Sequence, residues 1–143
     1  MLRLALAGKH ITAHRERGYV VPKYALLIYG DSSHLDELDQ LFGPFSNDTI
    51  LAHKHFATQI DRQGAKLITG APLEPPATAT SIHLDSHITD GPFIKSANTL
   101  DGFYIIEAYD LDHAIEIAKL CPAPNGGVEV RPVAELPDTA LAP

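Results

Sequence analysis

The sequence is poor in cysteine, with Cys121 as the single one among 143 residues. One cysteine excludes an internal disulfide, and we expect the chain to work in a reducing compartment, the cytoplasm. Because Cys121 precedes Pro122 where a helix is expected to end, we interpret it as a packing residue, with redox or nucleophilic work as the alternative. No apolar run approaches the roughly 20 residues of a membrane-spanning helix, so we predict no membrane partner.

Sequence motifs for several chemistries are also missing. There is no P-loop, no GxGxxG after an expected strand and no GxSxG, so we predict no nucleotide cofactor, no other cofactor and no serine-hydrolase chemistry. Eight histidines invite a metal hypothesis. However, His53 and His55 point to opposite sides of a helix, and His83 and His87, on either side of an expected turn, have no third ligand nearby. We therefore predict no metal site.

Charge is distributed unevenly along the chain. Residues 1–23 carry a net charge of +4, so the remainder carries −11 of the formal total of −7. An acidic body repels phosphates and favours neutral or cationic small molecules, so we predict no nucleic-acid partner. Residues 1–22 are expected to form a basic, loosely ordered extension, with a targeting peptide as the alternative. One domain is expected over residues 23–136, followed by a flexible tail at 137–143.

Apolar periodicity predicts the elements of the first half of the chain. They are a buried strand at 23–29, a short helix at 34–41, a longer helix from 46–48 to Gly64, a strand at 65–69 and a stiff proline-rich loop at 70–76. The inward stripe of the longer helix is expected to contain Ile50, His53, Ala57 and Ile60. His53 is therefore predicted to face the sheet.

The second half is expected to begin with a hairpin. The predicted elements are hairpin strands at 78–84 and 87–89, a turn at 90–91, a buried strand at 103–109, a helix after Asp110 and a last strand at 128–131. The apolar face of that helix is expected to contain Leu111, Ala114, Ile115 and Ala118. In the last strand, Val128 and Val130 lie on one side and the charged residues on the other.

The order of these elements indicates an α+β fold. Strand, helix, strand, hairpin, strand, helix and strand predict a ferredoxin-like split βαβ sheet with both helices on one face. Such a sheet leaves its other face bare. We expect a second copy to cover that face, which gives a homodimer.

Two residues are the first candidates for catalysis. In Asp90-Gly91-Pro92-Phe93 the glycine permits an unusual φ and the proline stiffens the exit, so the carboxylate of Asp90 is held in place. A fixed carboxylate can act as a general base or orient a histidine, whereas a plain turn is the alternative. His53, on the face of a helix that is expected to meet the sheet, is the second candidate, and a satisfied core residue is the alternative.

Further candidates lie on the expected strands. The guanidinium of Arg131 is able to clamp a substrate carboxylate with two parallel bonds, and pairing with Glu129 or Glu107 is the alternative. Tyr104 and Tyr29 offer hydroxyls on neighbouring strands, although strand tyrosines more often only pack.

Several blocks in order resemble the DGPF branch of the YCII-related family. The blocks are Lys23–Asp31, Pro75–Thr80, Thr89–Phe93, Gly102–Tyr104 and Val128–Pro132. The resemblance implies a small ferredoxin-like domain that pairs into a dimeric α/β barrel. It also implies an acid/base histidine about three turns before the glycine that ends the helix, with a carboxylate nearby. His53 and Gly64 fit that spacing.

This chain departs from the family pattern in the link after Phe93. DGPF relatives usually follow the phenylalanine with a glutamate two positions on, then a lysine, another glutamate and a double glycine. Here Lys95, Ala97, Asn98 and Asp101 stand in that stretch. If the link lines the cleft, either the site is altered or its ligand differs from that of the relatives. We expect Lys95 to contact the ligand together with Arg131 and Tyr104.

Two functions fit these residues. The first is a small cofactor-independent enzyme that isomerises, or eliminates a small group from, a compact polar or aromatic metabolite, with His53 and Asp90 as the acid/base pair. The alternative is a non-catalytic dimer that binds a small ligand or serves as an accessory protein, in which His53 is buried and neutral.

Overall fold

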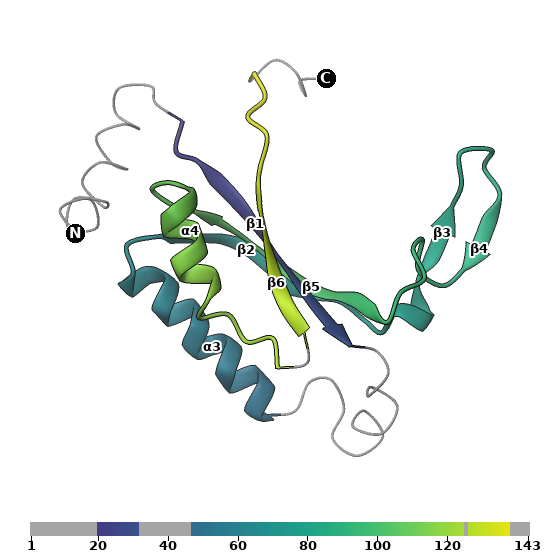
Figure 1. Ribbon diagram of the computed structural model, residues 1–143, viewed down its shortest axis with the longest axis horizontal. Coiled ribbons are helices and arrows are strands. Elements are labelled where there is room, and N and C mark those ends of the chain that lie inside the picture. The colour runs from purple at the N-terminus through teal and green to yellow at the C-terminus, as the bar shows by residue number, and fades with distance from the viewer. Residues whose placement is uncertain (1–19, 32–46, 125, 138–143) are drawn as a thin grey trace.

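The computed structural model describes residues 20–31, 47–124 and 126–137 of the chain (Figure 1). Its elements are β1 (Lys23–Asp31), α3 (Asn47–Arg62), β2 (Lys66–Pro72), the 3-10 helix η2 (Pro76–Thr78), β3 (Thr80–Ile82), β4 (Ile88–Asp90), β5 (Asn98–Glu107), α4 (Leu111–Ala118) and β6 (Gly126–Pro132). The helix predicted at 34–41 lies outside the described residues, as do most of the expected N-terminal extension and C-terminal tail.

Four strands form one antiparallel sheet in the order β2-β5-β1-β6. The unit β1-α3-β2 has β5 inserted between its strands, and the unit β5-α4-β6 has β1 inserted in the same way. Two interleaved split βαβ units of this kind make the ferredoxin-like α+β fold. The predicted fold class is confirmed.

The core lies between the sheet and the two helices. Leu26 of β1 and Ile106 of β5 are fully buried and belong to one cluster with Phe56 and Ile60 of α3 and Ile117 of α4. Alternate residues of a strand point to opposite faces, so α3 and α4 cover the same face of the sheet, as predicted.

The other face of the sheet carries apolar side chains as well. Leu27 lies opposite Phe103, and Ala25 lies opposite Ile105, each pair one residue out of phase with the core residues. All four side chains are partly exposed. We call these four residues the open face.

The predicted inward faces of both helices are partly wrong. In α3, Ile50 is 40% exposed, whereas Phe56, which was not predicted to be inward, is 1% exposed. In α4, Leu111 and Ile115 are exposed, and His113 and Ile117 are buried in addition to the predicted alanines. Apolar periodicity fixes the period of a helix, but the rotation of the helix about its axis depends on the sheet beneath it.

Helix ends agree with their sequence signals. Gly64 adopts a φ of 80°, and beside it the N–H of Ala65 donates to the carbonyl of Ile60 at 3.1 Å, which closes the end of α3. At the start of α4, a side-chain oxygen of Asp110 accepts from the N–H of His113 at 2.9 Å.

Strand boundaries differ more. β5 begins at Asn98, well before the predicted strand at 103–109, and β2 continues to Pro72 although residues 70–76 were predicted to be a loop. A proline is tolerated there because β2 is an edge strand. The strand predicted at 78–84 begins later than expected, because Thr78 is the last residue of η2 and β3 begins at Thr80.

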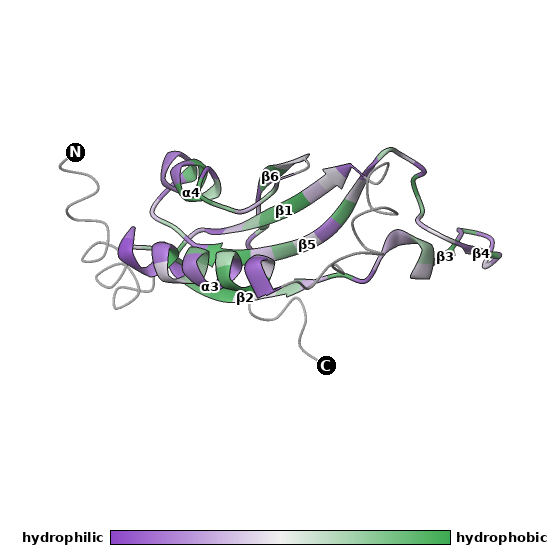
Figure 2. Ribbon diagram, turned by 90° about the horizontal axis from the view of Figure 1, so that it is seen from below, coloured by the Kyte–Doolittle hydropathy of each residue, from purple (hydrophilic) through white to green (hydrophobic). Residues whose placement is uncertain are grey.

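The predicted hairpin is present, but β3 and β4 form a separate two-stranded sheet. We call it the ribbon. It lies beyond the end of the main sheet and away from α3 in both views (Figures 1 and 2). Ile82 and Ile88 face each other across it, and both are mostly exposed.

None of the described helices is long and apolar enough to cross a membrane.

Candidate functional site

One polar pair joins the helix layer to the sheet. Nδ1 of His53 on α3 lies 2.7 Å from the hydroxyl oxygen of Tyr104 on β5. Tyr104 lies opposite Leu26 and Gly70, so its ring stands on the helix-covered face of the sheet. His53 was predicted to face the sheet, and the structure gives it a specific partner there.

Packing fixes the ring of Tyr104. Phe56 meets it edge-on, with ring centroids 5.2 Å apart. On the other side, Gly70 leaves room for the ring, because a Cβ on that residue would lie 2.5 Å from Cδ1 of Tyr104 and 2.9 Å from the carbonyl oxygen of Phe103. The contact with Phe56 and the space at Gly70 therefore keep the hydroxyl of Tyr104 within reach of His53.

Burial shifts both groups toward their neutral forms. Desolvation lowers the pKa of His53. The pKa of Tyr104 is raised to about 12, mainly by desolvation and to a smaller extent by the charge of the nearby Cys121. A neutral imidazole and a neutral phenol share one hydrogen bond in two ways. If Nδ1–H donates to Tyr104, Nε2 of His53 is a free base. If the hydroxyl donates to Nδ1, Nε2 carries the proton and is a hydrogen-bond donor.

We expect Gly70→Ala to break this hydrogen bond, because the new methyl group displaces the ring of Tyr104. The ¹⁵N shift of Nδ1 of His53 reports the loss directly by NMR. Gly127→Ala is the matched control, since a Cβ on Gly127 meets nothing within 4 Å. Unchanged His53 signals in Gly70→Ala would mean that Tyr104 is not held by the space above Gly70.

The other predicted site residues do not meet His53 within one chain. Asp90 ends β4 and is exposed on the ribbon, and Lys95 is exposed in the link from the ribbon to β5. Arg131 lies opposite Ala25, on the open face, and pairs there with Glu129. That contact is the alternative that the sequence left open for Arg131.

Sequence reasoning missed a buried histidine. His113 is 4% exposed; its Nδ1 accepts from the N–H of Tyr109 at 2.9 Å, and Nε2 donates to the carbonyl of Gln63 at 2.6 Å. The ring thereby ties α4 to the end of α3. Its position three residues after the N-cap Asp110 was visible in the sequence, but the contact with Gln63, 50 residues away, was not.

Two histidines of the ribbon meet as the sequence allowed. The rings of His83 and His87 stack with centroids 4.4 Å apart, and His83 also stacks on Phe93. Within residues 20–31, 47–124 and 126–137, no group of three or more histidine, cysteine or acidic side chains is placed to hold a metal ion.

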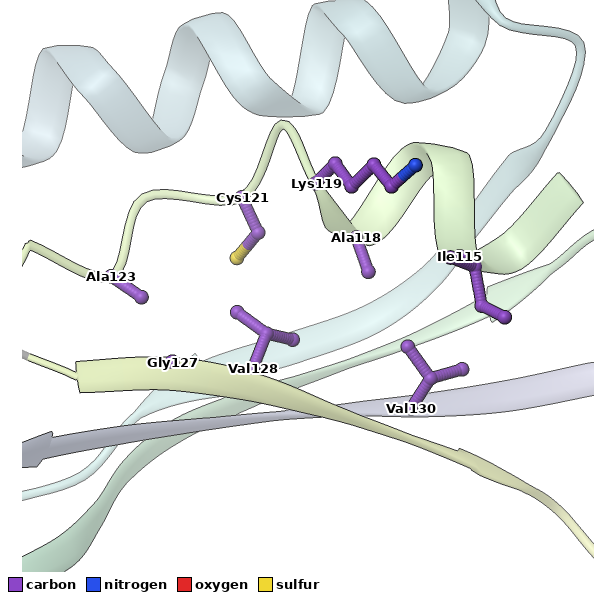
Figure 3. A pocket seen from close by; sticks show the side chains of 8 residues that line it. All are labelled: Ile115, Ala118, Lys119, Cys121, Ala123, Gly127, Val128 and Val130. Carbon is purple, nitrogen blue, oxygen red and sulfur yellow. The ribbon is translucent and has the colours of Figure 1, made fainter. Parts of the chain in front are cut away.

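A groove of about 490 Å³ runs between α4 and β6 (Figure 3). Ile115 and Ala118 of α4, Cys121, and Val128 and Val130 of β6 are among its lining residues. Burial raises the pKa of the Cys121 thiol to about 12, so the thiol is protonated and unreactive near neutral pH. This is what the interpretation of Cys121 as a packing residue requires.

Comparisons with known proteins point to one family. The family model described as YCII-related domain matches residues 23–137. The "Uncharacterized protein R00369" of Rhizobium meliloti (strain 1021) is 27% identical over 117 residues, which are 78% of this chain and 91% of that protein.

Proposed function

The chain belongs to the YCII-related domain family, and on that premise we propose that it transfers protons on a small polar or aromatic metabolite without a cofactor. The observation that carries the proposal is the 2.7 Å contact between Nδ1 of His53 and the hydroxyl of Tyr104. His53 is the acid/base in this proposal, and Tyr104 orients its ring through Nδ1.

The pair can move a proton in two steps. With Nδ1–H donating to Tyr104, Nε2 of His53 takes a proton from the substrate, and the hydroxyl oxygen stabilises the imidazolium that forms. Because burial lowers the pKa of His53, the imidazolium returns the proton readily. Return to another atom of the substrate completes an isomerisation, and return to a departing group completes an elimination.

The other predicted site residues can join His53 in one site only if a second copy of the chain is present. We propose that the open face packs on the open face of another chain, which buries Leu27, Phe103 and Ile105 of each. A dimer is also the way for Asp90 to reach a histidine, because its ribbon extends beyond its own sheet (Figure 1). Arg131 and Lys95 are proposed to bind the substrate in that assembly. We also propose that the chain belongs to the DGPF branch, which the residues around Asp90 support.

A second candidate function is ligand binding without catalysis. The observation that favours it is the same hydrogen bond, because His53 already has a partner for Nδ1 and stands beside the ring of Tyr104. In this reading the protein is an accessory or small-ligand-binding dimer.

Titration of His53 by NMR tests the two functions. We expect a midpoint below 6.5, the usual value for histidine, because burial lowers the pKa. The unfolded chain then binds this proton first as the pH falls. The His53 contribution to stability is therefore complete above pH 6.5 and is lost as the pH falls from there to the lowered pKa. For catalysis, the His53 signals must also move with one class among added small carboxylates and phenols.

Variants assign the partners of His53 in the same experiment. Tyr104→Phe removes the hydroxyl and should change the ¹⁵N shift of Nδ1. Asp90→Asn should lower the midpoint further if a carboxylate from a second copy stabilises the imidazolium. A His53 that does not titrate and ignores every ligand would overturn the proton-transfer proposal and leave the binding function.

A further inference from the structure

The two edges of the main sheet differ in how they are protected. Both edge strands end in a proline, Pro72 in β2 and Pro132 in β6, but β2 also has a register shift between Leu67 and Thr69, which discourages pairing with another strand. β6, at the other edge, pairs with β1 without any register shift. In the described part of the chain β6 has a strand on one side only, so it presents an edge that is regular up to its last residue, Pro132.

Charges and valines alternate along that edge. Glu129 lies opposite Leu27, and Arg131 lies opposite Ala25, so both charges stand on the open-face side of the sheet. Val128 and Val130 point to the other side, where they pack against the core. Two oppositely charged residues two positions apart on one side of an edge strand make the edge complementary to itself.

We propose that β6 pairs antiparallel with β6 of a second copy, about a two-fold axis at Val130. In that register each Glu129 lies directly opposite an Arg131, and the two Val130 residues lie opposite each other. A slip of two residues in one direction places Glu129 opposite Glu129, and a slip in the other places Arg131 opposite Arg131. Like charges directly opposite are unfavourable, so the charges select one register.

The groove beside β6 adds apolar area to this contact. Ile115 of α4 is 37% exposed and lines the groove together with Val128 and Val130 (Figure 3). A strand laid along β6 brings its own valines to the mouth of the groove and shields Ile115 from water. The result is one continuous eight-stranded sheet with all four helices on the same face.

This contact does not depend on the proposed function. It uses the edge of the sheet, whereas the dimer proposed above uses the open face. If both contacts form, the assembly contains four chains of 15.5 kDa, and if only the edge contact forms it contains two. Because the open-face contact alone also gives two chains, the mass of the wild-type protein shows whether one contact or both form, and the edge variants below show which contact a dimer uses.

A charge swap tests the edge contact. Glu129→Arg places two arginines opposite two arginines, and Arg131→Glu places two glutamates opposite two glutamates. We expect each variant alone to have half the mass of the wild-type assembly in sedimentation equilibrium. An equimolar mixture of the two variants should restore the wild-type mass, because every arginine then faces a glutamate of the other chain. The ion pair within one chain is absent from both variants and cannot explain a recovery.

Controls carry the same charge changes on α3. Asp61→Arg and Lys54→Glu alter exposed side chains and should leave the mass unchanged. Circular dichroism verifies that the edge variants are folded. Wild-type mass in either edge variant alone, or a mixture that stays at half the mass, would overturn the proposal.

Cysteine cross-linking provides a second measurement that needs no change of charge. In a Cys121→Ala background, Val130→Cys should form a covalent dimer on oxidation, since directly opposite residues of antiparallel strands are within disulfide reach. Val128→Cys should not, because the two copies of residue 128 lie four residues out of register, about 13 Å apart. Equal cross-linking at both positions, or none at Val130→Cys, would contradict the proposed register.

Discussion

Replacing Phe56 by alanine is expected to lower the free energy of unfolding by about 3–5 kcal/mol, the usual cost of deleting a fully buried aromatic ring. Phe56 is 1% exposed, and its ring packs edge-on against Tyr104 between α3 and the sheet. Few neighbours are free to move into the space, because Leu26 and Ile106 belong to the strands beneath. A domain of this size has a stability of roughly 5–15 kcal/mol, so the loss is a large fraction of the total.

Urea denaturation followed by circular dichroism measures the change. Leu51→Ala is the matched control, because Leu51 lies on the same helix and is 61% exposed. It should cost about 0.5 kcal/mol or less, as surface substitutions usually do. Similar losses for the two variants would mean that α3 turns a different face to the sheet.

Phe56 belongs to a part of the structure that the sequence predicted only incompletely. The order of elements predicted the split βαβ sheet with both helices on one face, because turn residues and apolar runs are local signals. Gly64 and Asp110 fixed two helix ends for the same reason. The inward faces of the helices could not be predicted from local signals alone. Nothing local distinguishes Ile50 from Phe56 as the residue that meets the sheet, because which of them is buried depends on how α3 packs on the sheet.

The candidate site shows the same division between local and long-range information. The spacing to Gly64 indicated His53, and its place on α3 facing the sheet agrees with that prediction. Its partner did not follow from the sequence, since Tyr104 is 51 residues away and its position depends on the space above Gly70. The Asp-Gly turn was predicted, and Gly91 has a φ of 95°. Where that turn stands relative to α3 depended on the separate ribbon, which no local signal placed.

The second large effect concerns the other histidine of the helix layer. His113→Ala is expected to lower the free energy of unfolding by about 3 kcal/mol, because it leaves the N–H of Tyr109 and the carbonyl of Gln63 without their buried partner. Thermal denaturation at neutral pH measures the loss. His53→Ala is the control on α3, and it should cost clearly less, since His53 is only partly buried and bonds to a hydroxyl that water can also satisfy.

The comparison of the two variants separates a histidine that holds the fold from one that is available for chemistry. His113 uses Nδ1 as an acceptor and Nε2 as a donor, so both ring nitrogens are committed to backbone groups. Among the described residues the structure assigns His53 one hydrogen bond, at Nδ1, and the proton transfer proposed above uses Nε2. If His53→Ala destabilised the protein as much as His113→Ala, the contact with Tyr104 would be primarily structural, and the ligand-binding function would be the better of the two proposals.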